Sequence, residues 1–270
     1  MAKASETNRS VYVEKIKVFT SAAHALLENE KFLLKEIKKN APDAALNKLV
    51  LSNKMLNLAS NYIAISGVSW AVLKTKNEEA LNDGRKSLYK AVIYLEDAVS
   101  NYIDAPFSDY EEKLQLITSF DANQRYSLVK KMGFAIDLLK QAYGDNTKWR
   151  WAFVELEGRY AAAAKNIIDL RSVYVNSSHE SPYYDATVYH LRLAKKLLSQ
   201  AAARYREKYE LSTGETLDFK TGITFLTALK RLHIILGETT DAEEIKKKIV
   251  IWTSKYDADV KKQEAEKKKS

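Results

Sequence analysis

The histidines and carboxylates of this chain, the residue types that most often bind metals or transfer protons, do not form a recognisable site motif. None of the four histidines has a glutamate three residues before it, which is the spacing used by the di-iron sites of helical bundles. A metal site needs several ligands that converge on one ion, and the histidines lie far apart in the sequence. We therefore expect each to be a surface residue or a hydrogen-bonded helix residue: His24, His179, His190 and His233.

Phosphate binding and covalent catalysis also lack a motif. The eight glycines are isolated and form neither a G-x-G-x-x-G loop nor a G-x-x-x-x-G-K loop. The chain has no cysteine, which excludes disulfides, thiolate ligands and cysteine nucleophiles. Paired carboxylates such as Glu111 and Glu112 fall where helices are expected to begin, and the helix dipole favours negative charge there without any catalytic role. We predict a non-enzymatic protein with no metal, no cofactor and no small-molecule substrate.

Two groups of basic residues could instead bind a partner, and the first is the run Lys148-Trp149-Arg150-Trp151. On a helix its two tryptophans point about 200° apart, so they cannot share one face. Apolar residues continue along the Trp151 side, which favours packing of Trp151 inside the protein. The alternative is an exposed recognition patch made by Lys148, Arg150 and Trp151.

The second basic group lies on the helix expected over residues 182–210. Arg192, Lys195, Lys196 and Arg206 occupy roughly a third of its circumference. Such residues ordinarily form a solvated surface. The functional alternative is a surface for an acidic protein, phospholipid headgroups or nucleic acid.

The excess of positive charge is densest near the C-terminus. Residues 261–270 contain five lysines and two glutamates, while the rest of the chain is nearly balanced. A nucleic-acid-binding domain usually carries its charge on the folded body. We predict that residues 261–270 form a Lys-rich flexible tail, which could add electrostatic attraction to the basic helix face.

Long helices must position all of these residues. The residues that most often interrupt helices are few, with eight glycines and three prolines in 270 residues. Apolar residues recur at spacings of three and four. No strand-like alternation of useful length is present. We predict an all-α fold of eight or nine mostly long antiparallel helices, in a layered bundle or a helical-repeat-like array. The expected helices cover approximately residues 10–40, 42–75, 77–103, 108–120, 122–143, 149–174, 182–210, 218–236 and 240–260.

Several residues are expected to begin or end these helices. The segment 40–42 should end the first helix, and Thr75 has the spacing of an N-cap for the third. Asp121 should cap the fifth helix, which Gly144 should end. The second helix is uncharged from Met55 to Leu73, which is long enough to span a bilayer. Because it is apolar on two faces, we predict a central helix packed on both sides, with a membrane span as the alternative.

The domain organisation and function follow from these patterns. The breaks at 104–108 and 145–147 are short, so we predict one domain over residues 1–260, with these breaks as the alternative points of division. The polar N-terminal residues predict a cytoplasmic protein. We predict a scaffold or adaptor that presents helix faces or an inter-helix groove to a protein partner, self-association included. The alternative function is binding of anionic membranes or nucleic acid through the basic helix face and the tail.

Overall fold

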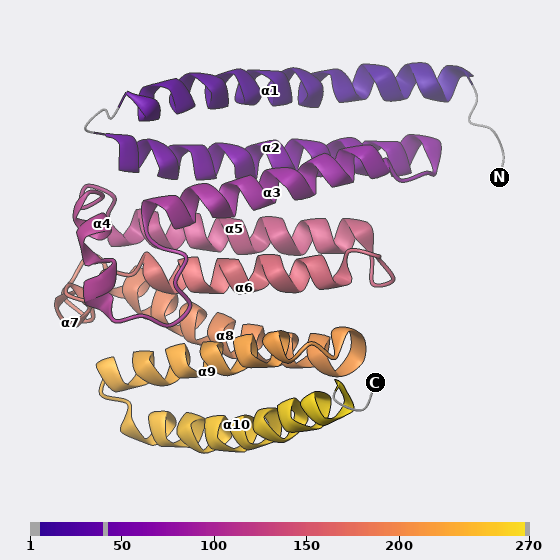
Figure 1. Ribbon diagram of the computed structural model, residues 1–270. Helices are drawn as coiled ribbons and strands as arrows, with labels where there is room; N and C mark the ends of the chain where they lie inside the picture. The colour runs from indigo at the N-terminus through magenta and orange to yellow at the C-terminus, as the bar shows by residue number, and fades with distance from the viewer. Residues whose placement is uncertain (1–5, 40–42, 268–270) are drawn as a thin grey trace. The chain divides into compact units, whose positions relative to one another are not determined.

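The computed structural model describes residues 6–39 and 43–267, and within these ranges the chain forms helices and connecting turns without any strand (Figure 1). The prediction of an all-α fold with mostly long helices is confirmed. The α-helices of the described residues are α1 (Glu6–Lys38), α2 (Ala44–Leu73), α3 (Glu78–Ala98), α4 (Glu111–Gln115), α5 (Ala122–Tyr143), α6 (Arg150–Asn166), α7 (Val173–Asn176), α8 (Tyr184–Lys208), α9 (Thr216–Ile235) and α10 (Thr239–Lys267). A 3₁₀ turn, η1 (Phe107–Asp109), precedes α4, and a π-helical turn, η2 (Tyr209–Thr213), follows α8.

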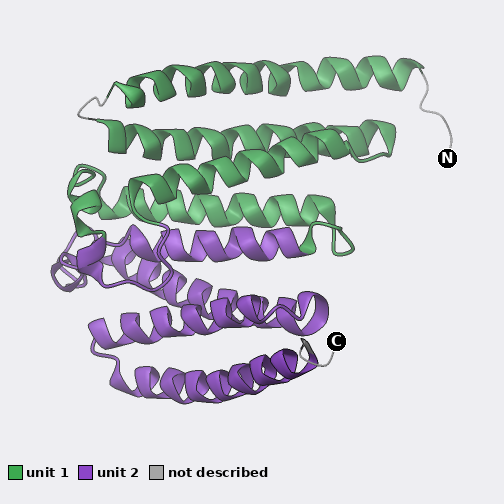
Figure 2. Ribbon diagram, viewed as in Figure 1, with its two compact units in different colours: residues 1–100, 110–150 green, residues 101–109, 151–270 purple. Residues whose placement is uncertain are grey.

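The chain divides into two compact units (Figure 2). Unit 1 comprises residues 1–100 and 110–150, and unit 2 comprises residues 101–109 and 151–270. The chain passes between the units near residues 100–110 and at the start of α6. Both crossings lie close to the breaks at 104–108 and 145–147 that the sequence indicates.

Helix α2 organises unit 1, where it packs against α1, α3 and α5. Its side chains Leu51, Met55 and Leu56 are fully buried, as are Leu81 and Leu88 of α3. Among the described residues, α2 is also the one helix with the length and apolar composition to cross a membrane. The two apolar faces of α2 therefore correspond to neighbours on more than one side, as predicted for a central helix.

Unit 2 is organised around α9, which packs against both α8 and α10. Aromatic rings join these helices: Tyr209 stacks on Phe219 at a centroid distance of 5.1 Å, and Phe219 lies 5.6 Å from the ring of Trp252. The backbones of α8 and α9 approach closely at Gly222, where an added Cβ would lie 3.0 Å from the carbonyl oxygen of Ala202. Ring packing and close helix approach thus hold α8, α9 and α10 together.

Some helix ends agree with the sequence and others correct it. Asp121 caps α5 in a capping box with Gln124, and Gly144 ends that helix with a φ of 81°. The cap of α3 is Asn77 rather than Thr75, because the Asn77 side chain accepts a hydrogen bond from the backbone of Ala80. The predicted helix over 108–120 shortens to η1 and α4. The predicted end of the first helix at 40–42 lies outside the described residues.

The largest correction concerns the predicted helix over 149–174. Helix α6 begins at Arg150 and ends at Asn166, and Tyr174, the last residue of the predicted helix, is 91% exposed in α7. The side chain of Asp169 accepts a hydrogen bond from the backbone of Arg171 at 3.1 Å. This local bond competes with the helical hydrogen-bond pattern and turns the chain without a glycine or proline.

Helix α10 continues to Lys267, so residues 261–267 of the expected Lys-rich tail extend this helix. No glycine or proline follows Gly237, and the segment consists mainly of good helix formers. Residues 268–270 lie outside the described residues.

Candidate functional site

Two of the four basic residues expected on one side of α8 form ion pairs within the protein, and the other two are exposed. Lys195 donates to both carboxylate oxygens of Glu238, at 2.6 and 2.9 Å. Arg206 bonds Glu210 at 2.9 Å and stacks over the ring of Trp252. The other two members, Arg192 and Lys196, are exposed. Two of the four cations therefore stabilise unit 2 itself, and the exposed positive charge is smaller than the sequence suggests.

The residues of the basic–aromatic run at 148–151 also differ in their surroundings. Trp149 precedes α6 and lies under the guanidinium of Arg85, whose central carbon is 4.0 Å from the ring centroid. Lys148 and Arg150 are exposed, whereas Trp151 is half-buried. Trp151 is thus neither fully buried nor fully exposed, and the alternative patch of Lys148, Arg150 and Trp151 stays a prediction.

A polar cluster connects the segment 101–109 to the helices of unit 2. Arg231 of α9 donates to the two carboxylate oxygens of Asp104 at 2.7 and 3.2 Å, and Asn166 of α6 donates to the carbonyl of Tyr102 at 2.9 Å. Lys165 is 6% exposed, and burial lowers the pKa of its amine to about 8, although the nearby Asp104 acts in the opposite direction. These interactions fix the position of the segment 101–109, which is a structural role.

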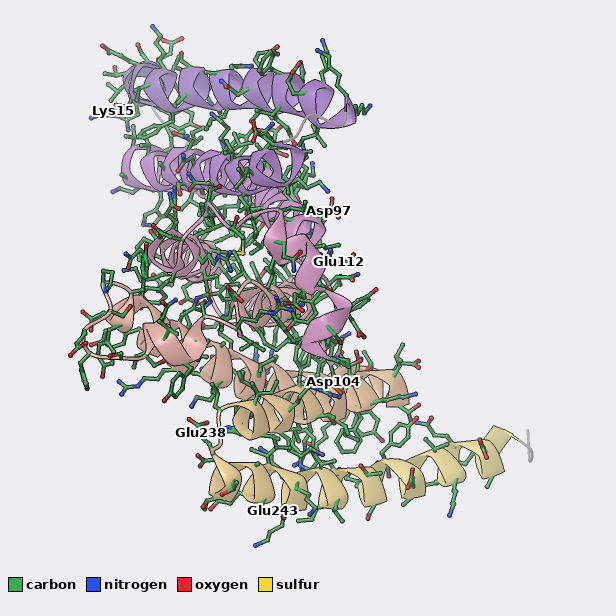
Figure 3. The ribbon with its side chains drawn as sticks, turned by 90° about the vertical axis from the view of Figure 1, so that its left-hand side faces the viewer. Lys15, Asp97, Asp104, Glu112, Glu238 and Glu243 are labelled. Atoms are coloured by element: carbon green, nitrogen blue, oxygen red, sulfur yellow. The ribbon has the colours of Figure 1, made fainter. Side chains whose placement is uncertain are left out.

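A second polar cluster lies where α9 turns into α10, the position of Glu238 in Figure 3. Gly237 adopts a left-handed conformation, and the backbone of Glu238 bonds the carbonyl of His233 at 2.9 Å, as in a Schellman helix end. This turn brings the carboxylate of Glu238 to 2.6 Å from Nδ1 of His233. His233, Glu238 and Asp241 could share a cation, but the ammonium of Lys195 already bonds Glu238.

The rotation of α1 on unit 1 is fixed by hydrogen bonds near both of its ends. Glu30 is 5% exposed and accepts bonds from Nζ of Lys90 at 2.9 Å and from the hydroxyl of Tyr94 at 2.6 Å. Burial and this bond raise the pKa of Tyr94. At the other end, the hydroxyl of Tyr12 accepts a bond from Asn77 at 3.0 Å. The same side of α1 therefore always faces the rest of unit 1, and the opposite side faces outward.

The outward side of α1 carries a regular apolar row, which we call the outer stripe: Val11, Val18, Ala25 and Phe32. Val18 and Phe32 are 66% and 61% exposed, Val11 is 36% exposed, and Ala25 is also exposed. Each member follows the previous one by seven residues. Seven residues fall only about 20° short of two full helical turns, so the four side chains form one row along the helix.

Charged rows run beside the outer stripe. One contains Glu14 and Glu28, and the next contains Lys17 and Lys31, all of them exposed. Lys31 bonds Glu28 at 2.8 Å, which lowers the pKa of that carboxyl. The surface is thus an apolar row with mixed charges on its flank, the arrangement found where one helix packs along another.

The outer stripe was not predicted from the sequence. The inner apolar residues of α1 give the stronger helical pattern, and they conceal the second row. The constant spacing of seven from Val11 to Phe32 is the signal that could have revealed it.

In the comparison with protein families, the model of the TP0443 family matches residues 8–260. The comparisons with curated proteins and with solved structures found no match. The matched range includes α1 with its outer stripe and both units.

Proposed function

The chain belongs to the TP0443 family, and from its geometry we propose that it is a non-enzymatic helical scaffold that docks another helix along the outer face of α1. The name of the family specifies no reaction, so the proposal depends on the structure of unit 1. The observation that carries it is the outer stripe of Val11, Val18, Ala25 and Phe32. The proposal includes the cytoplasmic location expected from the sequence.

The regular spacing of the exposed side chains supports docking of a helix. Single exposed apolar residues are common on protein surfaces and need no explanation. The outer stripe differs because its members repeat at the interval that keeps a row aligned with a partner helix. Removing a valine or phenylalanine side chain from water contributes about 1.5–3 kcal/mol when its burial is complete. Several such side chains in one row can therefore support association with one helix.

The rigidity of α1 supports the same proposal. Glu30 and Tyr12 hold the helix to unit 1 through hydrogen bonds, so the outer stripe does not need to be ordered before a partner binds. A preorganised surface loses less conformational entropy on association than a flexible one.

The test is site-specific capture of a partner by the full chain. A photoreactive phenylalanine analogue at position 25 should cross-link the docked helix, and the analogue at position 13 is the matched control. Val13 is also exposed and lies on α1, but it is outside the outer stripe. Substitution V18E together with F32E should abolish capture, whereas V13E should preserve it. Equal capture by both variants would contradict the proposal.

Binding to an anionic surface is the second candidate function. Arg192 and Lys196 on α8 are exposed, and so are Lys261 and Lys262 on α10. If these residues bind a membrane or nucleic acid, R192E with K196E should weaken binding to anionic lipid vesicles or to single-stranded RNA. That binding should also fall steeply with salt concentration. A helix-docking scaffold should show little of either effect.

A further inference from the structure

We infer that the turn between α9 and α10 is a zinc-binding site, where Nδ1 of His233 and one carboxylate oxygen each of Glu238 and Asp241 coordinate the ion. The inference concerns unit 2 and goes beyond the docking of a helix on α1. Among the described residues, these side chains are the one group of three or more histidines and carboxylates that could hold a metal ion, with their ligand atoms within 4.8 Å of one another. Figure 3 marks the turn by Glu238.

The backbone of the turn brings the three ligands together. His233 lies in the last turn of α9, and Asp241 lies in the first turn of α10. Between them, Gly237 adopts a left-handed conformation, and the backbone N–H of Glu238 donates to the carbonyl of His233. The ligands are therefore held near one another by the connection of the two helices, so zinc binding does not have to order a loop.

The distances between the ligand atoms are close to those of a zinc site. Tetrahedral zinc with bonds of about 2.0–2.1 Å places its ligand atoms about 3.3 Å apart. Nδ1 of His233 lies 2.6 Å from Oε2 of Glu238 and 3.8 Å from Oδ2 of Asp241. The first distance must lengthen and the second must shorten, each by less than about 1 Å. Asp241 is exposed and Glu238 is partly exposed, so both side chains have room for this movement.

Lys195 of α8 does not have to leave when zinc binds. Its ammonium donates to Oε1 of Glu238 at 2.6 Å and to Oε2 at 2.9 Å, whereas His233 contacts Oε2 alone. If zinc takes Oε2, Lys195 keeps its shorter bond to Oε1. Carboxylates that bind metals are themselves commonly hydrogen-bonded. The ion therefore replaces the hydrogen bond between His233 and Glu238 and leaves the ammonium in place.

The types of ligand favour zinc over the hard cations. Ca²⁺ and Mg²⁺ prefer oxygen ligands, whereas an imidazole nitrogen together with carboxylate oxygens suits zinc. His233 binds through Nδ1, so its neutral ring carries the proton on Nε2. Three protein ligands leave a fourth position for water. The bound ion would connect the end of α9 to the start of α10 and so stabilise unit 2.

Calorimetric titration of the chelator-treated full chain with zinc chloride at neutral pH tests the site. We expect one zinc ion per chain and no measurable binding of Mg²⁺. Asp241→Asn and His233→Gln should each weaken zinc binding at least about tenfold, since even outer-shell partners of a bound metal contribute this much. Asp241 is exposed, so its variant should remain folded. The matched controls are Glu243→Gln on the same helix and His24→Gln on α1, two exposed residues whose substitution should leave the affinity unchanged.

Urea unfolding with and without zinc supplies the second measurement. A ligand that binds the folded state stabilises it, so zinc should raise the urea midpoint of the natural chain and leave that of Asp241→Asn unchanged. A natural chain that binds no zinc would overturn the inference. Equal affinity of the natural chain and Asp241→Asn would do the same, as would zinc binding that His24→Gln abolishes. None of these results affects the docking surface of α1, which is tested by capture at position 25.

Discussion

The helices α1 of unit 1 and α10 of unit 2 are held in similar ways, but their outward sides differ. Each is about thirty residues long and packs mainly against one neighbour, α1 on α2 and α10 on α9. Each is also anchored by one glutamate: Glu30 bonds Lys90 and Tyr94, and Glu238 at the start of α10 bonds Lys195 and His233.

The outward sides of these two helices differ. On α10, the exposed apolar residues Val250 and Ile251 are neighbours in the sequence and do not repeat along the helix. Charged residues cover most of the remaining outward surface of α10. A polar outer face is what terminal helices of a helical array require to stay in water. Helix α1 carries the outer stripe instead, and this difference from α10 supports the proposal that α1 docks another helix.

The largest expected effect concerns the inner face of α10. Trp252 is 5% exposed and packs against Phe219, so Trp252→Ala should lower the free energy of unfolding by about 3–5 kcal/mol. Ile251, which is 68% exposed, is the control, and Ile251→Ala should change that free energy by less than about 0.5 kcal/mol. Urea unfolding followed by circular dichroism measures both. Similar losses for the two variants would show that the outward side of α10 is covered by a partner.

A smaller effect is expected at the anchor of α1. Glu30→Gln removes the charge that Lys90 and Tyr94 face, and should lower the free energy of unfolding by about 1–3 kcal/mol. Glu28 is an exposed carboxylate on the same helix and bonds the exposed Lys31. Glu28→Gln should therefore not change the free energy of unfolding measurably. The same urea measurements apply. An unchanged stability of Glu30→Gln would mean that this anchor does not hold α1 in place.

The helices could be predicted from the sequence more completely than their ends. Repeated apolar spacing reports which side of a helix is buried, and burial dominates the stability of a helical fold. Beyond the end of α6, for example, the backbone N–H of Arg171 donates a hydrogen bond to the side chain of Asp169. Asn166 likewise bonds Tyr102, 64 residues earlier. Periodicity within one helix contains no information on such bonds.

The candidate site was predictable only in part, for a related reason. Helical geometry places Lys195 and Arg206 on one side of α8, but it does not reveal that Glu238 lies 43 residues away from Lys195 in the sequence and beside it in space. Exposed cations and cations in ion pairs look the same in the sequence. The spacing of the outer stripe was visible there, yet the sequence does not show which of the two apolar rows of α1 faces the rest of the unit.

The smallest expected effect concerns the anchor at the start of α10 and is a dependence of stability on pH. Burial raises the pKa of Glu238, but hydrogen bonds from Lys195 and His233 lower it by a larger amount. The pKa of Glu238 in the folded state therefore lies below the usual 4.5. Ionised Glu238 therefore stabilises the folded chain above the pKa of the unfolded state, and this contribution disappears as the pH falls through the folded-state pKa. Because a third of this side chain is exposed, at 32%, we expect a contribution of no more than about 1 kcal/mol.

Urea unfolding from about pH 6 to about pH 3 measures this contribution as the difference between the natural chain and Glu238→Gln. The two stabilities should converge as the pH falls, because protonated glutamate and glutamine carry the same charge. Glu243→Gln is the matched control: Glu243 is an exposed carboxylate on the same helix, bonded to the exposed Lys246. A constant difference between Glu238→Gln and the natural chain over this range would mean that α10 is held by its apolar face alone. In that case α10 would be held by apolar contacts such as those of Trp252, whereas α1 would be held by a glutamate.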